Sequence, residues 1–263
     1  MRRIFFHQSP QSPRPNFSSS NPPFEAGLQG AADEFDVQEY LWNEVDPDSS
    51  QIFEMDGATL YQPKSYVHSY AYPLILWLHN NGQSDAQAGQ VIPKISDRNY
   101  MGAGLKGTFP ELKNGSIGYR WSLVDDHVDQ TLEEIYSLCM EIRSVWNIHT
   151  ERIYLAGVGA GASVATQMVL KRPEWFGGLI SIAPEPFEMV HPLAKFREMR
   201  HLQAMLIDDS NNQNPSDQWR SLFGSAGVKT LYNSYENASE MPQNLLQEMD
   251  RFLINSLAAA PTL

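Results

Sequence analysis

One glycine-rich stretch constrains the fold of this chain more than any other feature. Residues 153–157 are mostly apolar, as in a short buried strand, and Gly157, Gly159 and Gly161 follow one another at alternate positions. Small residues up to Ala165 then begin a helix. A strand that turns sharply into a helix needs glycine, because the two elements pass too close for a Cβ atom and the residue at the bend is forced toward positive φ. The stretch therefore predicts a strand–turn–helix reversal with Gly159 at its centre.

Length, charge and cysteine content narrow the class of protein. The 263 residues suffice for one α/β domain with an appendage, since such domains run to roughly 200–250 residues. A formal net charge of −12 argues against nucleic acid or an anionic membrane surface as a partner. The single cysteine, Cys139, excludes an internal disulfide and a cysteine-based zinc site. No apolar run reaches the length of a membrane span, and the apolar start of the chain stops at His7 without a cleavage pattern. We expect a cytoplasmic protein without a metal ion or cofactor.

The composition changes along the chain and predicts three regions. Residues 1–30 are rich in Ser, Pro, Asn and Gln, and such a segment has too little apolar surface to offset its chain entropy. We interpret it as a disordered tail rather than a docking segment. Residues 31–50 form an acidic lead-in, and residues 51–258 carry the patterns of a folded α/β domain.

Apolar runs predict the strands of a sheet. Residues 51–61 alternate apolar and polar side chains around Asp56-Gly57, which predicts an antiparallel hairpin. Residues 74–78 form a continuous apolar run, as expected of a strand buried on both faces of a mainly parallel sheet. Further strands are expected within residues 100–107, 178–183, 202–207 and 228–235.

Helical patterns alternate with these strands. Apolar residues recur at spacings of three and four over residues 126–145, and Asp125-Asp126 suit a helix cap and the helix dipole. A second helix is expected from the glycine bend to Lys171, and a third over the apolar stripe of residues 245–253. Strands that alternate with helices predict an α/β sheet with helices on both faces.

Several segments, in order along the chain, resemble the phospholipase/carboxylesterase family of α/β-hydrolases. Residues 72–79 are similar to the family strand that leads into a His-Gly oxyanion loop, and residues 118–121 resemble its Tyr-x-Trp segment. Residues 151–157 are similar to the strand before its nucleophile, and residues 175–181 to the strand after the next helix. The resemblance implies an α/β-hydrolase fold, with a mainly parallel central sheet and helices on both faces.

The resemblance also implies where a catalytic triad would lie. In this fold the nucleophile stands at the centre of G-x-S-x-G, and the acid and then the histidine follow it along the chain. The nucleophile position is Gly159, the acid position is Asn212, or Asn211 if the alignment slips by one, and the histidine position is Ser239. The last histidine in the sequence, His201, precedes the acid loop. None of these positions therefore holds the group that the chemistry needs.

Other groups near the bend are weaker candidates for a catalytic or binding role. The resemblance implies that Asn81 and Ala160 would supply the oxyanion-hole N–H groups, which either bind a carbonyl or anion without a nucleophile or face water. Ser163 fits a relaxed G-x-S-x-A pattern and is the alternative nucleophile. It stands about one helical turn past the bend, where we expect its hydroxyl to lie within helix packing or to bond back to a carbonyl.

Metal binding is disfavoured by the spacing of the remaining candidates. His79 and His127, taken with Asp125, Asp126 and Asp129, match no zinc motif. We expect His79 to make hydrogen bonds within its loop and the aspartates to form a solvated helix start.

The sequence leaves three functions open. The first is an esterase-like domain without its triad, a pseudo-hydrolase that binds a small acyl or ester-like ligand or a protein partner. The second is an active carboxylic-ester hydrolase that uses a displaced nucleophile such as Ser163. The third is a structural subunit that pairs with an active homologue. Fold-level likeness alone does not choose among them.

Overall fold

A computed structural model describes residues 51–55, 57–113, 115–187, 195–211 and 216–258, which all belong to one structural unit. The expected tail at 1–30 and the acidic lead-in at 31–50 lie outside the described residues, and so does Asn212. No helix among the described ranges is long and apolar enough to cross a membrane.

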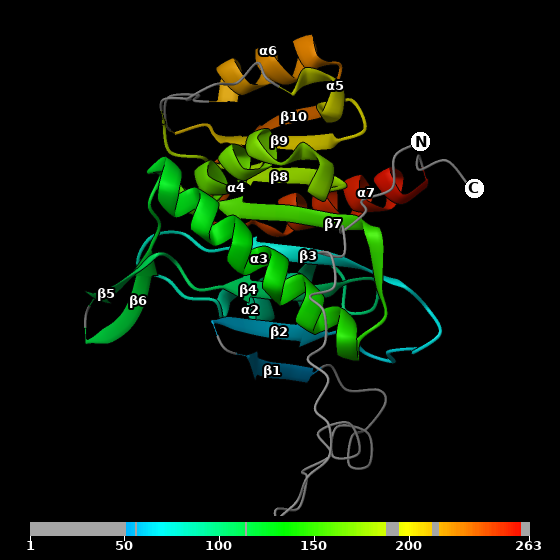
Figure 1. Ribbon diagram of the computed structural model, residues 1–263. Helices are drawn as coiled ribbons and strands as arrows, with labels where there is room; N and C mark the ends of the chain where they lie inside the picture. Colours follow the sequence, from blue (N-terminus) through cyan, green and yellow to red (C-terminus); the bar gives the residue numbers. More distant parts are fainter. Residues whose placement is uncertain (1–50, 56, 114, 188–194, 212–215, 259–263) are drawn as a thin grey trace, which may run out of the picture. The chain divides into compact units, whose positions relative to one another are not determined.

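An eight-stranded sheet forms the centre of this unit, with the strand order β1-β2-β4-β3-β7-β8-β9-β10 (Figure 1). The pairs β1–β2 and β2–β4 are antiparallel, and the other neighbouring pairs are parallel. The expected hairpin and every expected apolar strand are present. The strands of this sheet are β1 (Gln51–Met55), β2 (Ala58–Gln62), β3 (Tyr72–Leu78), β4 (Met101–Leu105), β7 (Ile148–Val158), β8 (Gly178–Ile182), β9 (Gln203–Asp209) and β10 (Lys229–Tyr235).

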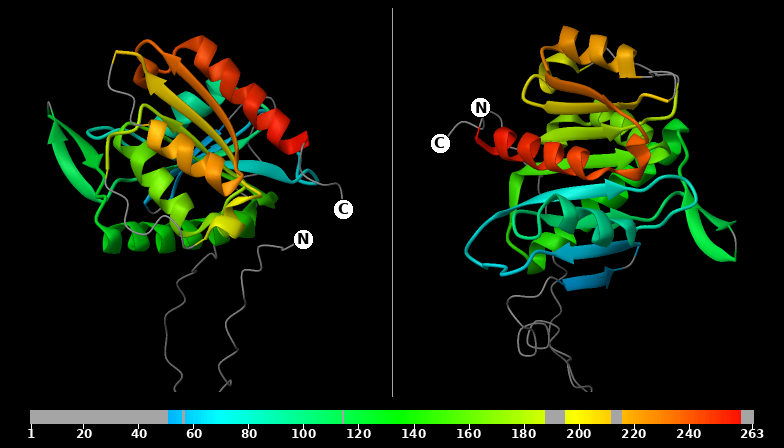
Figure 2. Two further views of the ribbon diagram at one scale, coloured as in Figure 1. Left: turned by 90° about the horizontal axis from the view of Figure 1, so that it is seen from above. Right: turned by 180° about the vertical axis from the view of Figure 1, so that it is seen from behind.

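Helices cover both faces of the sheet (Figure 2). On one face lie α3 (Asp125–Val145), α4 (Ala160–Lys171) and α6 (Ser216–Ala226), and on the other lie α2 (Gln87–Ile95) and α7 (Gln243–Ala258). Short helical segments are η1 (Pro173–Trp175), α5 (Phe196–Met199) and η2 (Ala238–Glu240).

The two helical layers enclose two hydrophobic cores, one on each side of the sheet. Along β3, Leu74, Leu76 and Leu78 enter the core beneath α3 and α4, whereas Ile75 and Trp77 enter the core beneath α2 and α7. Successive strand residues point to opposite faces, so a strand with helices on both sides has no polar position. This explains the continuous apolar run of β3.

A second, two-stranded sheet lies to one side of the main sheet and was not expected from the sequence (Figure 1). Its strands are β5 (Phe109–Lys113) and β6 (Ser116–Arg120), joined by an Asn-Gly dipeptide that is typical of two-residue hairpin turns. Leu112 and Ile117 are paired across the hairpin, and they are 76% and 69% exposed.

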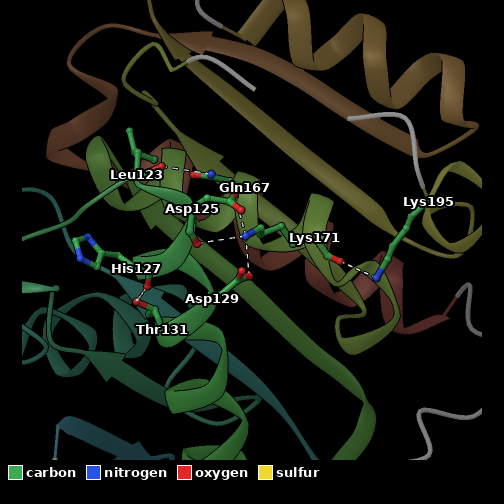
Figure 3. Close-up of polar contacts among 8 residues, drawn as sticks. All are labelled: Leu123, Asp125, His127, Asp129, Thr131, Gln167, Lys171 and Lys195. Atoms are coloured by element: carbon green, nitrogen blue, oxygen red, sulfur yellow. Dashed lines mark hydrogen bonds and ion pairs between the residues drawn. The ribbon is translucent and has the colours of Figure 1, made fainter. Parts of the chain in front are cut away.

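The start of α3 differs from expectation. The residue that precedes the helix is Val124, and no side chain caps the free N–H groups there, so the expected cap at Asp125-Asp126 was wrong. Asp125 instead contacts Lys171, whose Nζ lies 2.8 Å from Asp125 Oδ1 and 2.7 Å from Asp129 Oδ1 (Figure 3). Lys195 Nζ donates to the Lys171 carbonyl at 2.8 Å. The two ion pairs hold the C-terminal end of α4 against α3, and Lys195 joins the same end to the segment before α5.

Candidate functional site

The chain reverses at Gly159, between the end of β7 and the first residue of α4. Gly159 has φ of 58° and ψ of −126°, a backbone conformation that L side chains rarely adopt. Its N–H donates to the Ile182 carbonyl at the end of β8, at 2.9 Å. The expected strand–turn–helix reversal is therefore present, with Gly159 at the bend.

The glycines on either side of the bend have no room for a side chain. A Cβ atom at Gly157 would lie 2.6 Å from the Gly161 carbonyl group. A Cβ atom at Gly161 would lie 2.3 Å from the Leu78 carbonyl oxygen and 2.4 Å from that of His79. The first turn of α4 thus packs directly on the backbone at the end of β3, and only glycine permits this approach.

The Asn80 side chain lies against the bend. Its Oδ1 accepts hydrogen bonds from the Asn81 N–H at 2.8 Å and from the Ala160 N–H at 3.2 Å. These are the two N–H groups that the resemblance assigned to an oxyanion hole. A Cβ atom at Gly159 would lie 2.2 Å from Asn80 Oδ1 and 2.4 Å from its Cγ. The carboxamide of Asn80 therefore fills the space that a side chain at Gly159 would need.

The loop that carries Asn80 is fixed at several points. The Asn80 carbonyl accepts from the Gln83 N–H at 3.1 Å. Asn81 Oδ1 accepts from the Trp121 N–H at 2.9 Å, and the indole Nε1 of Trp121 donates to the His79 carbonyl at 2.7 Å. Gly82 N–H donates to the carbonyl of Tyr119, in β6, at 2.8 Å. The side hairpin and the segment after it thus hold the loop in place against α4.

His79 is fully buried beside this loop. Its Nδ1 lies 2.7 Å from the Asn80 carbonyl oxygen, and since a carbonyl only accepts, Nδ1 carries the proton. Nε2 has no hydrogen-bond partner within the described part of the chain. Burial lowers the pKa of His79 below its ordinary value, so the ring is neutral. Among the described residues no cluster of His, Cys, Asp or Glu is arranged to hold a metal ion.

The loops after β9 and β10 adjoin each other, and the first of them contains Asn211, the alternative acid position. Ser210 N–H donates to the Tyr235 carbonyl at 3.0 Å, and Asn211 Nδ2 donates to Asn237 Oδ1 at 3.2 Å. Ser239 lies two residues further on, exposed in η2. Because β7 to β10 are parallel, these loops and Gly159 lie at the same edge of the sheet.

Solved structures of esterases are similar to this chain in fold. A carboxylesterase from Mesorhizobium loti matches with a TM-score of 0.61 at 11% identity, over 78% of this chain and 98% of that one. An esterase from the fungus Rhizomucor miehei matches with 0.60 at 13%, over 81% and 84%. A carboxylesterase from Bacillus cereus matches with 0.57 at 14%, over 70% and 89%. No protein-family model and no curated protein matches the sequence. The chain has an α/β-hydrolase fold.

Ser163, the alternative nucleophile, is fully buried inside α4 of this hydrolase fold. Its Oγ lies 2.7 Å from the Glu185 carbonyl oxygen and 3.4 Å from that of Gly159. A hydroxyl that donates to a carbonyl is not deprotonated by it, since the carbonyl is no base at neutral pH. The geometry at Ser163 is that of a structural hydroxyl.

Asn80 is the residue of this candidate site that sequence reasoning missed. In the His-Gly loop that residues 72–79 resemble, glycine follows the histidine, whereas this chain has Asn80 after His79. A side chain stands in the loop where the resemblance implies glycine, and a glycine stands at the bend where it implies a serine. A side chain after His79 together with a glycine at the nucleophile position is the sequence signal that would have predicted the contact between Asn80 and the bend.

Proposed function

We propose that this protein is an esterase-like α/β-hydrolase, of the phospholipase/carboxylesterase kind, that has lost its Ser-His-Asp triad and works by binding rather than by catalysis. Its ligand is a small acyl or ester-like molecule or a protein partner. The observation that carries the proposal is the position of Gly159 at the strand–helix bend, because a glycine has no atom that attacks an ester.

The expected loss of hydrolytic rate enhancement follows from how a catalytic triad works. Its members act as a unit, and an enzyme without them keeps about 10³–10⁴-fold rate enhancement over water from the oxyanion hole and substrate binding. In this chain the amides of Asn81 and Ala160 already donate to Asn80 Oδ1. The residual enhancement is therefore also expected to be absent.

The alternative, an active hydrolase that uses Ser163, has less support. A serine nucleophile needs a base as its hydrogen-bond acceptor, whereas Ser163 Oγ lies closest to a carbonyl oxygen. A structural subunit that pairs with an active homologue is the protein-partner version of the main proposal. It differs only in the identity of the partner.

Hydrolysis of p-nitrophenyl acetate tests the proposal. The full-length protein and the Ser163→Ala variant are each assayed over a range of substrate concentrations, with urea-unfolded protein as the control for reaction with surface side chains. We expect no saturable turnover from any of the three samples, and the same slow background from the wild type and Ser163→Ala. Saturable turnover by the folded protein would contradict the proposal, and its loss in Ser163→Ala would establish the displaced nucleophile.

A further inference from the structure

We infer that Asn80 is a built-in occupant of the oxyanion-type pocket. Its carboxamide oxygen holds the Asn81 and Ala160 amides and thereby excludes carbonyl and carboxylate groups from outside the chain. The inference rests on the proposed function in one respect, that Gly159 carries no nucleophile. It also narrows that function, because a pocket filled by Asn80 favours a protein partner over a small acyl or ester-like ligand at the bend.

Gly159 and Asn80, the two unusual residues of the site, are compatible because the absence of a side chain at Gly159 leaves room for the Asn80 carboxamide. With a Cβ–Oδ1 separation of 2.2 Å, a side chain at Gly159 and the observed rotamer of Asn80 exclude each other. Glycine at the bend makes the room that the carboxamide occupies. Asparagine in the loop in turn supplies an acceptor for two part-buried N–H groups, and a donor removed from water without a partner is costly.

The pocket is preorganised to hold an oxygen atom. Asn80 Oδ1 lies at the N-terminus of the twelve-residue helix α4, where the helix dipole favours negative charge. The loop backbone is held by Gln83, and the Asn81 side chain is engaged by Trp121, so the Asn81 N–H stays directed at Oδ1. The carboxamide thus takes the place that a ligand oxygen would take.

An occupied pocket has a consequence for any outside ligand. Such a ligand binds only during the fraction of time that Asn80 is turned away, so its apparent dissociation constant rises by the inverse of that fraction. The bend of this protein is therefore closed to small carbonyl ligands in its resting state, and removal of the Asn80 side chain opens it.

The pKa of a carboxylate placed at position 80 tests the inference, with its neighbour as a matched control. In Asn80→Asp the carboxylate would accept two N–H bonds at the start of α4, whereas in Asn81→Asp it would accept one, from Trp121. His79 and Asp85, the titratable groups near this loop, are common to both variants. Each variant's new carboxyl ¹³C signal is followed against pH in the full-length protein.

We expect the pKa of the carboxyl in Asn80→Asp to lie below that in Asn81→Asp and below the ordinary value of about 3.9. A pKa at position 80 equal to or above that at position 81 would overturn the inference. The esterase assay reports only on catalysis and this titration only on Asn80, so either result stands without the other.

A second variant serves if Asn80→Asp does not fold. Formate is titrated into ¹⁵N-labelled wild type and Asn80→Gly, and the Asn81 and Ala160 amide signals are followed. We expect both signals to move in Asn80→Gly and neither to move in wild type. The same response in the two proteins, including none in both, would overturn the inference.

Discussion

Adding one methyl group at Gly159 is the sharpest perturbation of the contact with Asn80. The new Cβ atom would lie 2.2 Å from Asn80 Oδ1, so the carboxamide must move. Both hydrogen bonds that its oxygen accepts are then lost. Alanine would also have to adopt the observed φ of 58°. Two separate costs are therefore expected, one from the backbone and one from the displaced side chain.

The two costs can be worked out separately. A non-glycine residue held in such a sparsely populated backbone region costs about 1–3 kcal/mol. The two hydrogen bonds of Asn80 are worth about 0.5–1.5 kcal/mol each. Gly159→Ala is thus expected to lower the free energy of unfolding by about 2–6 kcal/mol in the wild type, but by only about 1–3 kcal/mol in Asn80→Gly, where the bonds are already gone. The interaction energy of the cycle is then about 1–3 kcal/mol.

Urea unfolding followed by tryptophan fluorescence measures this cycle. A matched control is Gly57→Ala, because Gly57 has φ of 77° and a Cβ atom there would meet no atom of the described residues within 4 Å. Gly57→Ala should carry the backbone cost alone and should be additive with Asn80→Gly. Additivity of Gly159→Ala with Asn80→Gly to within about 0.5 kcal/mol would refute the reasoning.

Three further predictions concern residues other than Gly159 and Asn80. Lys171→Met removes the ion pairs to α3 and should lower the free energy of unfolding by about 1 kcal/mol, and a loss that persists unchanged at high salt would contradict the electrostatic cause. Burial raises the pKa of the Cys139 thiol to about 12, so a thiol reagent at about pH 8 should label the unfolded protein only, and rapid labelling of the native protein would be inconsistent. Because burial lowers the pKa of His79, the contribution of this residue to stability should be complete above about pH 6.5 and should decline as the pH falls toward the folded pKa. A titration midpoint of His79 at or above about pH 6.5, measured by NMR in the folded protein, would contradict this.

Much of the fold could be predicted because its determinants are local. The apolar run of β3 and the alternation of β1 report directly on how many faces of each strand are covered, whereas β2 is buried at all five positions although its sequence alternates. The three glycines at the bend report on backbone crowding and positive φ. Helix α2 was not predicted, because Gly89 and Pro93 are poor helix formers and its helical state depends on packing against the sheet.

The state of the candidate site could not be predicted, because it depends on contacts between distant segments. Asn80 and Ala160 are 80 residues apart, and no sequence pattern shows that a side chain of one loop meets a helix start so far along the chain. The carbonyl partner of Ser163 likewise lies in the segment after β8. The sequence identified the groups at the bend, and only the structure shows which groups their hydrogen bonds engage.

Retention of the bend is understandable in energetic terms. A serine at the observed φ is strained, and enzymes tolerate such strain at sites where it serves a mechanism. Glycine adopts the same conformation without that cost. Replacing the residue at Gly159 by serine would therefore add strain and a collision with Asn80 without supplying a base.

Labelling with a fluorophosphonate probe, read by intact-protein mass spectrometry, tests the central claim most directly, because the probe forms a covalent bond only with an activated nucleophile such as a catalytic serine. We predict that the folded, full-length protein keeps its unmodified mass after prolonged exposure to the probe. Addition of one probe per chain, lost on unfolding and mapped to a serine, would show a working nucleophile and contradict the account.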